Sequence, residues 1–138
     1  MSGKEQDFIK EAFDTNWVVP LGPNVNAFEK SLQDFLIENG KLKIENEGKQ
    51  VVALSAGTAA LHLGLILLGV QAGDEVICQS FTFCASANPV TYLGATAVFV
   101  DSEEDTWNMN PVLLEEAIRD RIAKTGREPK AIIPVHLY

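Results

Sequence analysis

The chain has 138 residues, of which 46% are hydrophobic and 22% charged, and this composition is enough for one ordinary hydrophobic core. We therefore expect a single soluble domain rather than a disordered chain. The formal net charge of -8 repels nucleic-acid phosphates and anionic lipids, so neither nucleic acid nor a membrane surface is expected as a partner.

The first ten residues and the longest apolar run indicate where in the cell the protein is expected. Residues 1–10 contain no apolar stretch of the kind that a secretory signal needs, and the longest apolar run, 61–70, is too short to span a bilayer. A cytoplasmic location is expected, and there Cys78 and Cys84 favour free, half-buried thiols over a disulfide. A metal site would need further ligands near these cysteines, so no metal is expected.

One helix is predicted in the N-terminal part of the chain. Apolar residues at helical spacing indicate a helix over about Val25–Asn39, with Asn26 and Glu29 as a capping pair and Gly40 as the left-handed residue after its end. The segment before it, 17–23, contains two prolines and a glycine and is predicted to be extended.

From residue 50 onward, after a polar stretch over 41–49 that predicts a loop, short apolar runs alternate with helical patterns. This alternation predicts an α/β fold with a mostly parallel sheet and helices on both faces. The strands are predicted at 51–54, 75–78, 97–100 and 131–135, and the helices at 58–68, 88–93 and 111–123. Asn110 and Pro111 mark a good helix start, and Gly126 a good stop.

The last predicted strand, 131–135, is followed by no helix that could cover the sheet beyond it. We therefore interpret the chain as the incomplete N-terminal portion of a larger domain. It divides into an N-terminal segment, residues 1–23, and an α/β part, residues 24–138.

The first candidate site segment is 54–62, where a predicted strand turns into a helix. Free N–H groups and the dipole at a helix start suit an anionic phosphate, and the small residues Gly57, Ala59 and Ala60 let an anion approach the backbone. The segment matches neither the dinucleotide-binding glycine pattern nor the P-loop pattern. A plain helix start after a strand remains an equal alternative.

Two further segments follow predicted strands. Phe81 and Phe83 come directly after the strand at 75–78, where an aromatic ring could stack on a planar heteroaromatic cofactor, although two such rings could equally fill the core. His136 lies at the end of the last strand and could bond a substrate or cofactor oxygen, although a lone histidine is more often structural. His62 is interpreted as structural.

Five motifs occur in one order along nearly the whole chain, and together they are far more specific than any of them alone. The same motifs occur in the same order in the DegT/DnrJ/StrS family of sugar aminotransferases, which the chain therefore resembles. The motifs are Ser55-Ala-Gly-Thr-Ala-Ala-Leu-His-Leu63, Gly73-Asp-Glu-Val-Ile77, Phe81-Thr-Phe-Cys-Ala-Ser-Ala-Asn88, Gly94-Ala-Thr-Ala-Val-Phe-Val-Asp101 and Ile133-Pro-Val-His-Leu-Tyr138.

The resemblance implies the large domain of a fold type I transferase that binds pyridoxal 5'-phosphate (PLP), with active sites at a homodimer interface. It implies that backbone amides around Gly57, Thr58 and Ala59 hold the cofactor phosphate and that Phe83 stacks on the pyridine ring. Asn16 and Trp17 match a family segment near the active site, so they are expected to contact substrate together with His136.

The segment 16–29 resembles the family branch that aminates UDP-linked 4-keto-6-deoxy-N-acetylhexosamines. This implies a nucleotide-sugar substrate, an amino-acid donor such as glutamate, and a role in surface polysaccharide or glycan biosynthesis. The family's Schiff-base lysine and the aspartate that pairs with the pyridine nitrogen both lie beyond position 138. No catalytic residue is therefore expected within these residues, and the 138-residue chain alone is expected to be inactive.

Two alternatives to a sugar aminotransferase stay open from the sequence. The first is a PLP-dependent sugar dehydratase of the same family, which lacks the Schiff-base lysine. The second is a non-catalytic, flavodoxin-like binding domain that is complete at this length.

Overall fold

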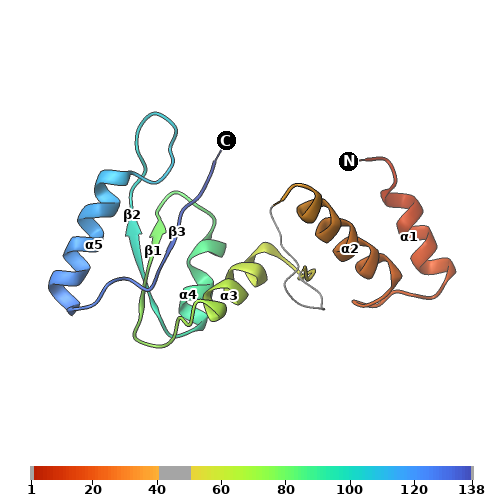
Figure 1. Ribbon diagram of the computed structural model, residues 1–138, viewed down its shortest axis with the longest axis horizontal. Helices are drawn as coiled ribbons and strands as arrows, with labels where there is room; N and C mark the ends of the chain where they lie inside the picture. Colours follow the sequence, from red (N-terminus) through yellow and green to blue (C-terminus); the bar gives the residue numbers. More distant parts are fainter. Residues whose placement is uncertain (1, 41–50, 138) are drawn as a thin grey trace. The chain divides into compact units, whose positions relative to one another are not determined.

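The computed structural model describes residues 2–40 and 51–137 and divides into two compact units, Met1–Ala53 and Leu54–Tyr138. The first unit holds α1 (Glu5–Asp14) and α2 (Pro23–Glu38). The second unit holds the elements of an α/β fold (Figure 1). They are α3 (Gly57–Leu67), β1 (Glu75–Gln79), the short 3-10 helix η1 (Cys84–Ser86), α4 (Asn88–Tyr92), β2 (Thr96–Val100), α5 (Pro111–Thr125) and β3 (Ala131–Ile133).

Helix α2 begins at Pro23, earlier than the sequence pattern predicts. A proline suits the first helical position, because its φ is already helical and the N–H that it lacks would have no partner there. The predicted capping pair is wrong, since Asn26 and Glu29 lie inside the helix and Gly22 precedes it. Gly40 has a φ of 65°, which confirms the left-handed residue after the helix.

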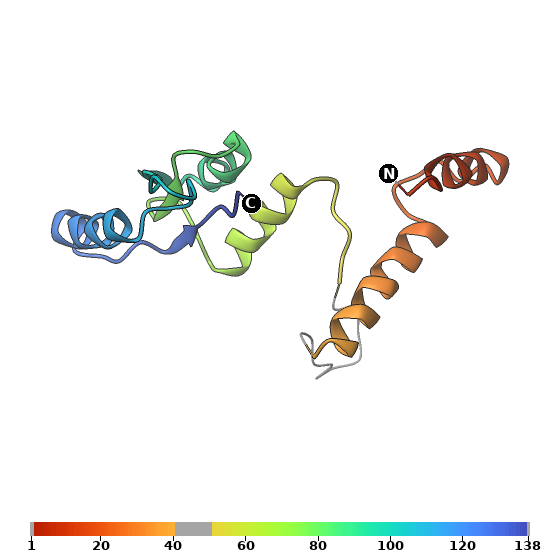
Figure 2. The same ribbon diagram turned by 90° about the horizontal axis from the view of Figure 1, so that it is seen from above.

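The second unit contains a three-stranded sheet in the order β2-β1-β3, in which both pairs of neighbours are parallel. Val76 of the central strand pairs with Ala97 of β2 and with Ala131 of β3. Figure 2 shows α3 and α4 on one face of this sheet and α5 on the other. The predicted parallel sheet with helices on both faces is confirmed.

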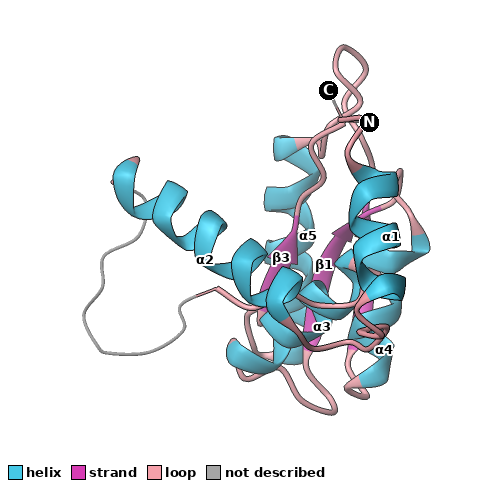
Figure 3. Ribbon diagram, turned by 90° about the vertical axis from the view of Figure 1, so that its right-hand side faces the viewer, coloured by secondary structure: helices cyan, strands magenta, loops and turns pink. Residues whose placement is uncertain are grey.

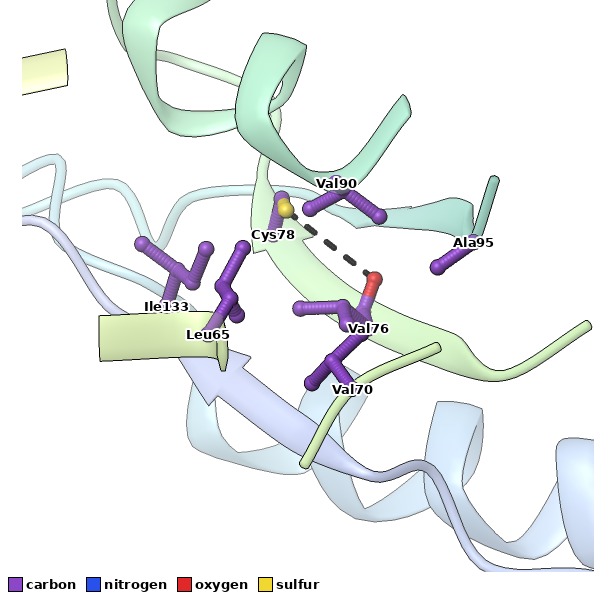
Figure 4. Packing of buried hydrophobic residues seen from close by; sticks show 7 residues of the cluster. All are labelled: Leu65, Val70, Val76, Cys78, Val90, Ala95 and Ile133. Atoms are coloured by element: carbon purple, nitrogen blue, oxygen red, sulfur yellow. Dashed lines mark hydrogen bonds between the residues drawn. The ribbon is translucent and has the colours of Figure 1, made fainter. Parts of the chain in front are cut away.

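The core lies between the central strand and the helices on one face of the sheet (Figure 4). Because successive side chains of a strand point to opposite faces, Val76 and Cys78 point together toward Leu65 of α3 and Val90 of α4. Ile77 points to the other face and is also fully buried. Strand β1 is thus covered on both sides, as its continuous apolar pattern indicates.

One of the predicted strands is wrong, because residues 51–54 form no strand. A strand needs hydrogen-bonded neighbours, and here the Ala53 N–H donates to the Glu29 carboxylate at 3.0 Å instead. The predicted loop 41–49 lies outside the described residues. Strand β3 lies beside β1 (Figure 3) and stops at Ile133, because Pro134 has no N–H to donate to a neighbouring strand.

The last helix has the predicted ends. Asn110 accepts hydrogen bonds from the N–H groups of Val112 and Leu113, at 2.9 and 3.2 Å, and so caps the start of α5. Gly126 follows the helix at a φ of 71°. A partly buried ion pair between Arg121 Nε of α5 and Glu75 Oε2 of β1, at 3.1 Å, then attaches the helix to the sheet.

The two cysteines are both free, but neither is half-buried: Cys78 is fully buried and Cys84 is exposed. Burial raises the pKa of the Cys78 thiol to about 11, so about one molecule in a thousand carries the reactive thiolate at pH 8.

We expect iodoacetamide to alkylate Cys84 in the native protein and Cys78 only after unfolding in urea. Peptide mass spectrometry measures both sites, and equal native labelling would contradict this burial.

Candidate active site

The start of α3 offers backbone donors for which the described part of the chain supplies no acceptor. Ala56 precedes the helix in an extended conformation and makes no side-chain capping bond, whereas Asn110 caps α5. The Ala56 carbonyl accepts from the N–H groups of Ala59 and Ala60, at 3.0 and 3.2 Å. The N–H groups of Gly57 and Thr58 lie before this first turn and have no acceptor within the helix, so an anion can bind them.

The surroundings of Gly57 leave room for such an anion. A Cβ atom built at this position would meet no heavy atom within 4 Å. The φ of Gly57 is not positive, so the backbone conformation does not require glycine at this position. The open space beside the helix start, rather than the turn, is what a phosphate would use, and the residues present fit that group.

Phe83 lies just beyond β1 and precedes η1, and its side chain is 85% exposed. The idea that it fills the core is therefore wrong. Phe83 lines a hollow of about 280 Å³ together with Phe81, Thr82, Val135 and Leu137. An exposed ring on a largely apolar wall is a suitable platform for a planar heteroaromatic group.

The helix start and the hollow lie at the same edge of the sheet. Helix α3 packs against both η1 and α4, on one face of the sheet (Figures 1 and 2). Ala60, near its start, lines a groove with Pro134, which follows the carboxyl end of β3. The structure thus brings Gly57, Thr58 and Ala59 to the edge where Phe83 lies, although the segment before Gly57 is not the predicted strand.

The two histidines differ in their surroundings. His136 follows β3 and is exposed, and it is not one of the residues that line the hollow, although Val135 and Leu137 on either side of it are. His62 of α3 is half-buried, and its ring contacts the ring of Tyr92 edge to face at a centroid distance of 5.5 Å. This packing supports the structural interpretation of His62.

Asn16 and Trp17, the other expected substrate contacts, lie in the first unit. Asn16 has a φ of 54°, a conformation that asparagine adopts more readily than most residues. The indole Nε1 of Trp17 donates to the Leu21 carbonyl at 2.6 Å, and the ring lines a pocket of about 150 Å³ between α1 and α2. The Trp17 ring is therefore fixed by its own turn.

Gly22 is needed for this position of Trp17. Its φ is 150°, and a Cβ atom there would lie 2.0 Å from the indole Nε1. We expect Gly22→Ala to expel the Trp17 ring and lower the free energy of unfolding by roughly 1–3 kcal/mol, through backbone strain and the lost bond. A red shift of Trp17 emission, isolated in a Trp107→Phe background, measures the displacement. Gly3→Ala, where φ is 89° but no atom lies within 4 Å, is the control for backbone strain alone.

Sequence reasoning missed one buried polar residue at this edge. Gln79, the last residue of β1, is fully buried. Its Nε2 donates to Ser102 Oγ at 3.1 Å and to the Trp107 carbonyl at 2.7 Å, and its Oε1 accepts from the Val135 N–H at 3.3 Å. The available signal was a single amide directly after the apolar run 76–78 of the central strand, because a polar group at such a position must find partners.

Residues 2–40 and 51–137 contain neither a metal-binding cluster nor a membrane-spanning helix. No cluster of three or more His, Cys, Asp or Glu side chains in this part of the chain could hold a metal ion. No helix there combines the length and the apolar character that crossing a membrane requires.

Known proteins with similar sequences and structures identify the family. Residues 1–138 match the model of the DegT/DnrJ/EryC1/StrS aminotransferase family. The chain is 51% identical to EpsN of Bacillus subtilis (strain 168), named as a pyridoxal phosphate-dependent aminotransferase, and 41% identical to the GDP-perosamine synthase of Caulobacter vibrioides. Each match covers 100% of this chain and 33% of the relative, so the chain spans about a third of their length.

The solved structures agree with the sequence relatives. The crystal structure of a DegT/DnrJ/EryC1/StrS aminotransferase from Brucella abortus superimposes with a TM-score of 0.77 at 39% identity, over 96% of this chain and 32% of that one. The architecture is that of fold type I PLP-dependent aminotransferases. The chain therefore belongs to the DegT/DnrJ/EryC1/StrS aminotransferase family.

Proposed function

We propose that the full-length protein is a PLP-dependent aminotransferase that converts a nucleotide-linked 4-keto-6-deoxy sugar into the 4-amino sugar, with glutamate as donor, for surface polysaccharide or glycan biosynthesis. Residues 1–138 form the N-terminal portion of its PLP-binding large domain, with an N-terminal segment over 1–23 and an α/β part over 24–138. The protein acts in the cytoplasm as a homodimer.

The observation that carries this proposal is the pairing of an uncapped helix start with an exposed aromatic ring at one edge of a parallel sheet. The N–H groups of Gly57 and Thr58 bind the cofactor phosphate, helped by the α3 dipole, and the small side chain of Ala59 lets the phosphate approach them, although the Ala59 N–H itself donates to the Ala56 carbonyl. Phe83 packs against the pyridine ring and keeps water from that face. PLP, when bound, supplies the electron sink that lets an amino group move between donor and sugar.

The residues of this chain bind and orient, and none of them is assigned a proton transfer. His136, Asn16 and Trp17 are proposed to contact the substrate, His136 through an imidazole hydrogen bond to a sugar or cofactor oxygen. The Schiff-base lysine is assigned to residues beyond 138.

Two similarities bear on the nucleotide that the substrate carries. The similarity of segment 16–29 to the UDP-N-acetylhexosamine branch favours a UDP-linked sugar. A relative that is 41% identical is named for a GDP-linked sugar, perosamine, so GDP is the competing choice.

The decisive experiment supplies the full-length protein with PLP, glutamate and either the UDP-linked or the GDP-linked 4-keto-6-deoxy sugar. We expect 2-oxoglutarate to form in step with a 4-amino sugar, seen by mass spectrometry, with the UDP-linked substrate preferred. A sugar product that has lost a hydroxyl group and carries no amino group would indicate the dehydratase instead. No PLP binding and no turnover would favour a non-catalytic binding domain.

A further inference from the structure

The buried Gln79 side chain joins the two walls of the hollow that Phe83 lines. Strand β1 is central in the sheet, so a side chain at its carboxyl end lies between the segments that follow β2 and β3. Through its amide group Gln79 reaches Ser102 and Trp107 on one side and Val135 on the other. Both N–H donors and the carbonyl oxygen of the side chain are thus in use.

On the β2 side, Gln79 fixes an aromatic residue in an uncommon conformation. Trp107 has a φ of 62°, which residues other than glycine rarely adopt. Its carbonyl accepts the shorter of the two hydrogen bonds that the Gln79 Nε2 donates. The Trp107 ring lies 5.5 Å, centroid to centroid, from the ring of Phe81, which itself lines the hollow. The Gln79 bond therefore helps to position this aromatic pair.

On the β3 side, Gln79 acts together with a second amide. The Val135 N–H donates to Gln79 Oε1, and the Leu137 N–H donates to Asn108 Oδ1 at 3.2 Å. Two side-chain amides thus bind alternate N–H groups beyond Pro134, where the strand has ended. Val135 and Leu137 both line the hollow, so their position determines its shape.

From this geometry we infer that Gln79 is a positioning residue for the ring of the cofactor: it sets the distance between the Phe81–Phe83 wall and the Val135–Leu137 wall. The inference rests on the proposed function, because it takes the hollow as the place of the pyridine ring. Gln79 touches neither the α3 start nor the phosphate proposed there, so its effect is confined to recognition of the ring.

The test compares Gln79→Glu with Gln71→Glu in the full-length protein, prepared without cofactor. Both variants make the same change, but Gln71 is exposed and its side chain lies outside this network. A glutamate at position 79 keeps the shape of the side chain and loses both N–H donors. At pH 8 we expect the dissociation constant for PLP to rise about tenfold in Gln79→Glu relative to Gln71→Glu. Inorganic phosphate should bind both variants equally.

A pH series supplies a readout that a general loss of structure would not give. Burial raises the pKa of a glutamic acid at position 79, and its protonated form regains one O–H donor. The PLP affinity ratio of the two variants should therefore approach one as the pH falls from about 8 to about 6. Equal PLP affinities at pH 8, or parallel weakening of PLP and phosphate, would overturn the inference.

A second pair of variants covers the case in which Gln79→Glu does not fold. Asn108→Ala removes the acceptor of the Leu137 N–H, whereas Asn108→Asp keeps it. PLP should bind several-fold more weakly to Asn108→Ala than to Asn108→Asp, with phosphate binding unchanged. Equal PLP binding by this pair would overturn the inference. If the unaltered protein binds phosphate but not PLP, the proposed function fails, and the inference fails with it.

Discussion

Replacing Gly57 by valine is expected to raise the dissociation constant of the full-length protein for PLP on the order of 100-fold. The valine side chain would occupy the open space at the α3 start and keep the phosphate from the N–H groups of Gly57 and Thr58. Two hydrogen bonds to a charged group together contribute roughly 3 kcal/mol, and losing them corresponds to about a 100-fold rise in the dissociation constant. Thr58→Ala removes at most one side-chain bond and should cost about tenfold.

The control for Gly57→Val is Gly64→Val in the same helix. A Cβ atom built at either glycine meets no heavy atom within 4 Å, and neither glycine has a positive φ. The two variants therefore place the same side chain on α3 without backbone strain, one at the proposed phosphate site and one away from it. PLP affinity, measured by titration of absorbance, should fall only in Gly57→Val. Similar affinities in both would mean that the α3 start does not hold the phosphate.

The sequence predicts the second unit well because its signals are local. Asn110 before Pro111 and Gly126 after Thr125 define α5 by capping chemistry that needs no distant contact. The apolar run of β1 indicates a strand that is buried on both faces. The helices and strands after residue 57, apart from the short η1, could therefore be located from composition and periodicity alone.

One error occurs where a distant partner decides the structure, and another has a local cause. Residues 51–54 have the pattern of a strand, but the Glu29 carboxylate binds the Ala53 N–H, and no neighbouring strand is present in the described residues. Helix α1 was not predicted, because its ten residues, Glu5–Asp14, are mostly polar and none of them is buried.

The candidate site was predictable in its residue types but not in its connections. The segments around Gly57 and Phe83 carry signals in the sequence, a small-residue helix start and an aromatic after a strand. The Gln79 amide signals that partners exist but not which residues they are, because they are 23, 28 and 56 positions away along the chain. Only the parallel order of the strands brings Ser102, Trp107 and Val135 around one amide.

Leu65→Ala is expected to lower the free energy of unfolding by about 2–5 kcal/mol, the range for removing a buried leucine side chain. Leu65 is 3% exposed and packs in the cluster that joins α3 to β1, β3 and α4. The helix with the proposed phosphate site therefore depends on this residue for its attachment to the sheet. Urea unfolding measures the effect as a lower midpoint concentration with an unchanged slope.

Leu67→Ala is the matched comparison, because it makes the same change two residues further along α3, on a side chain that is 78% exposed. Its free energy of unfolding should stay within about 0.5 kcal/mol of the original, since little apolar area leaves the core. Equal losses for both variants would mean that helix propensity, rather than burial against the sheet, determines the stability of α3. Since both substitutions introduce alanine, the best helix former, any difference between them measures packing alone.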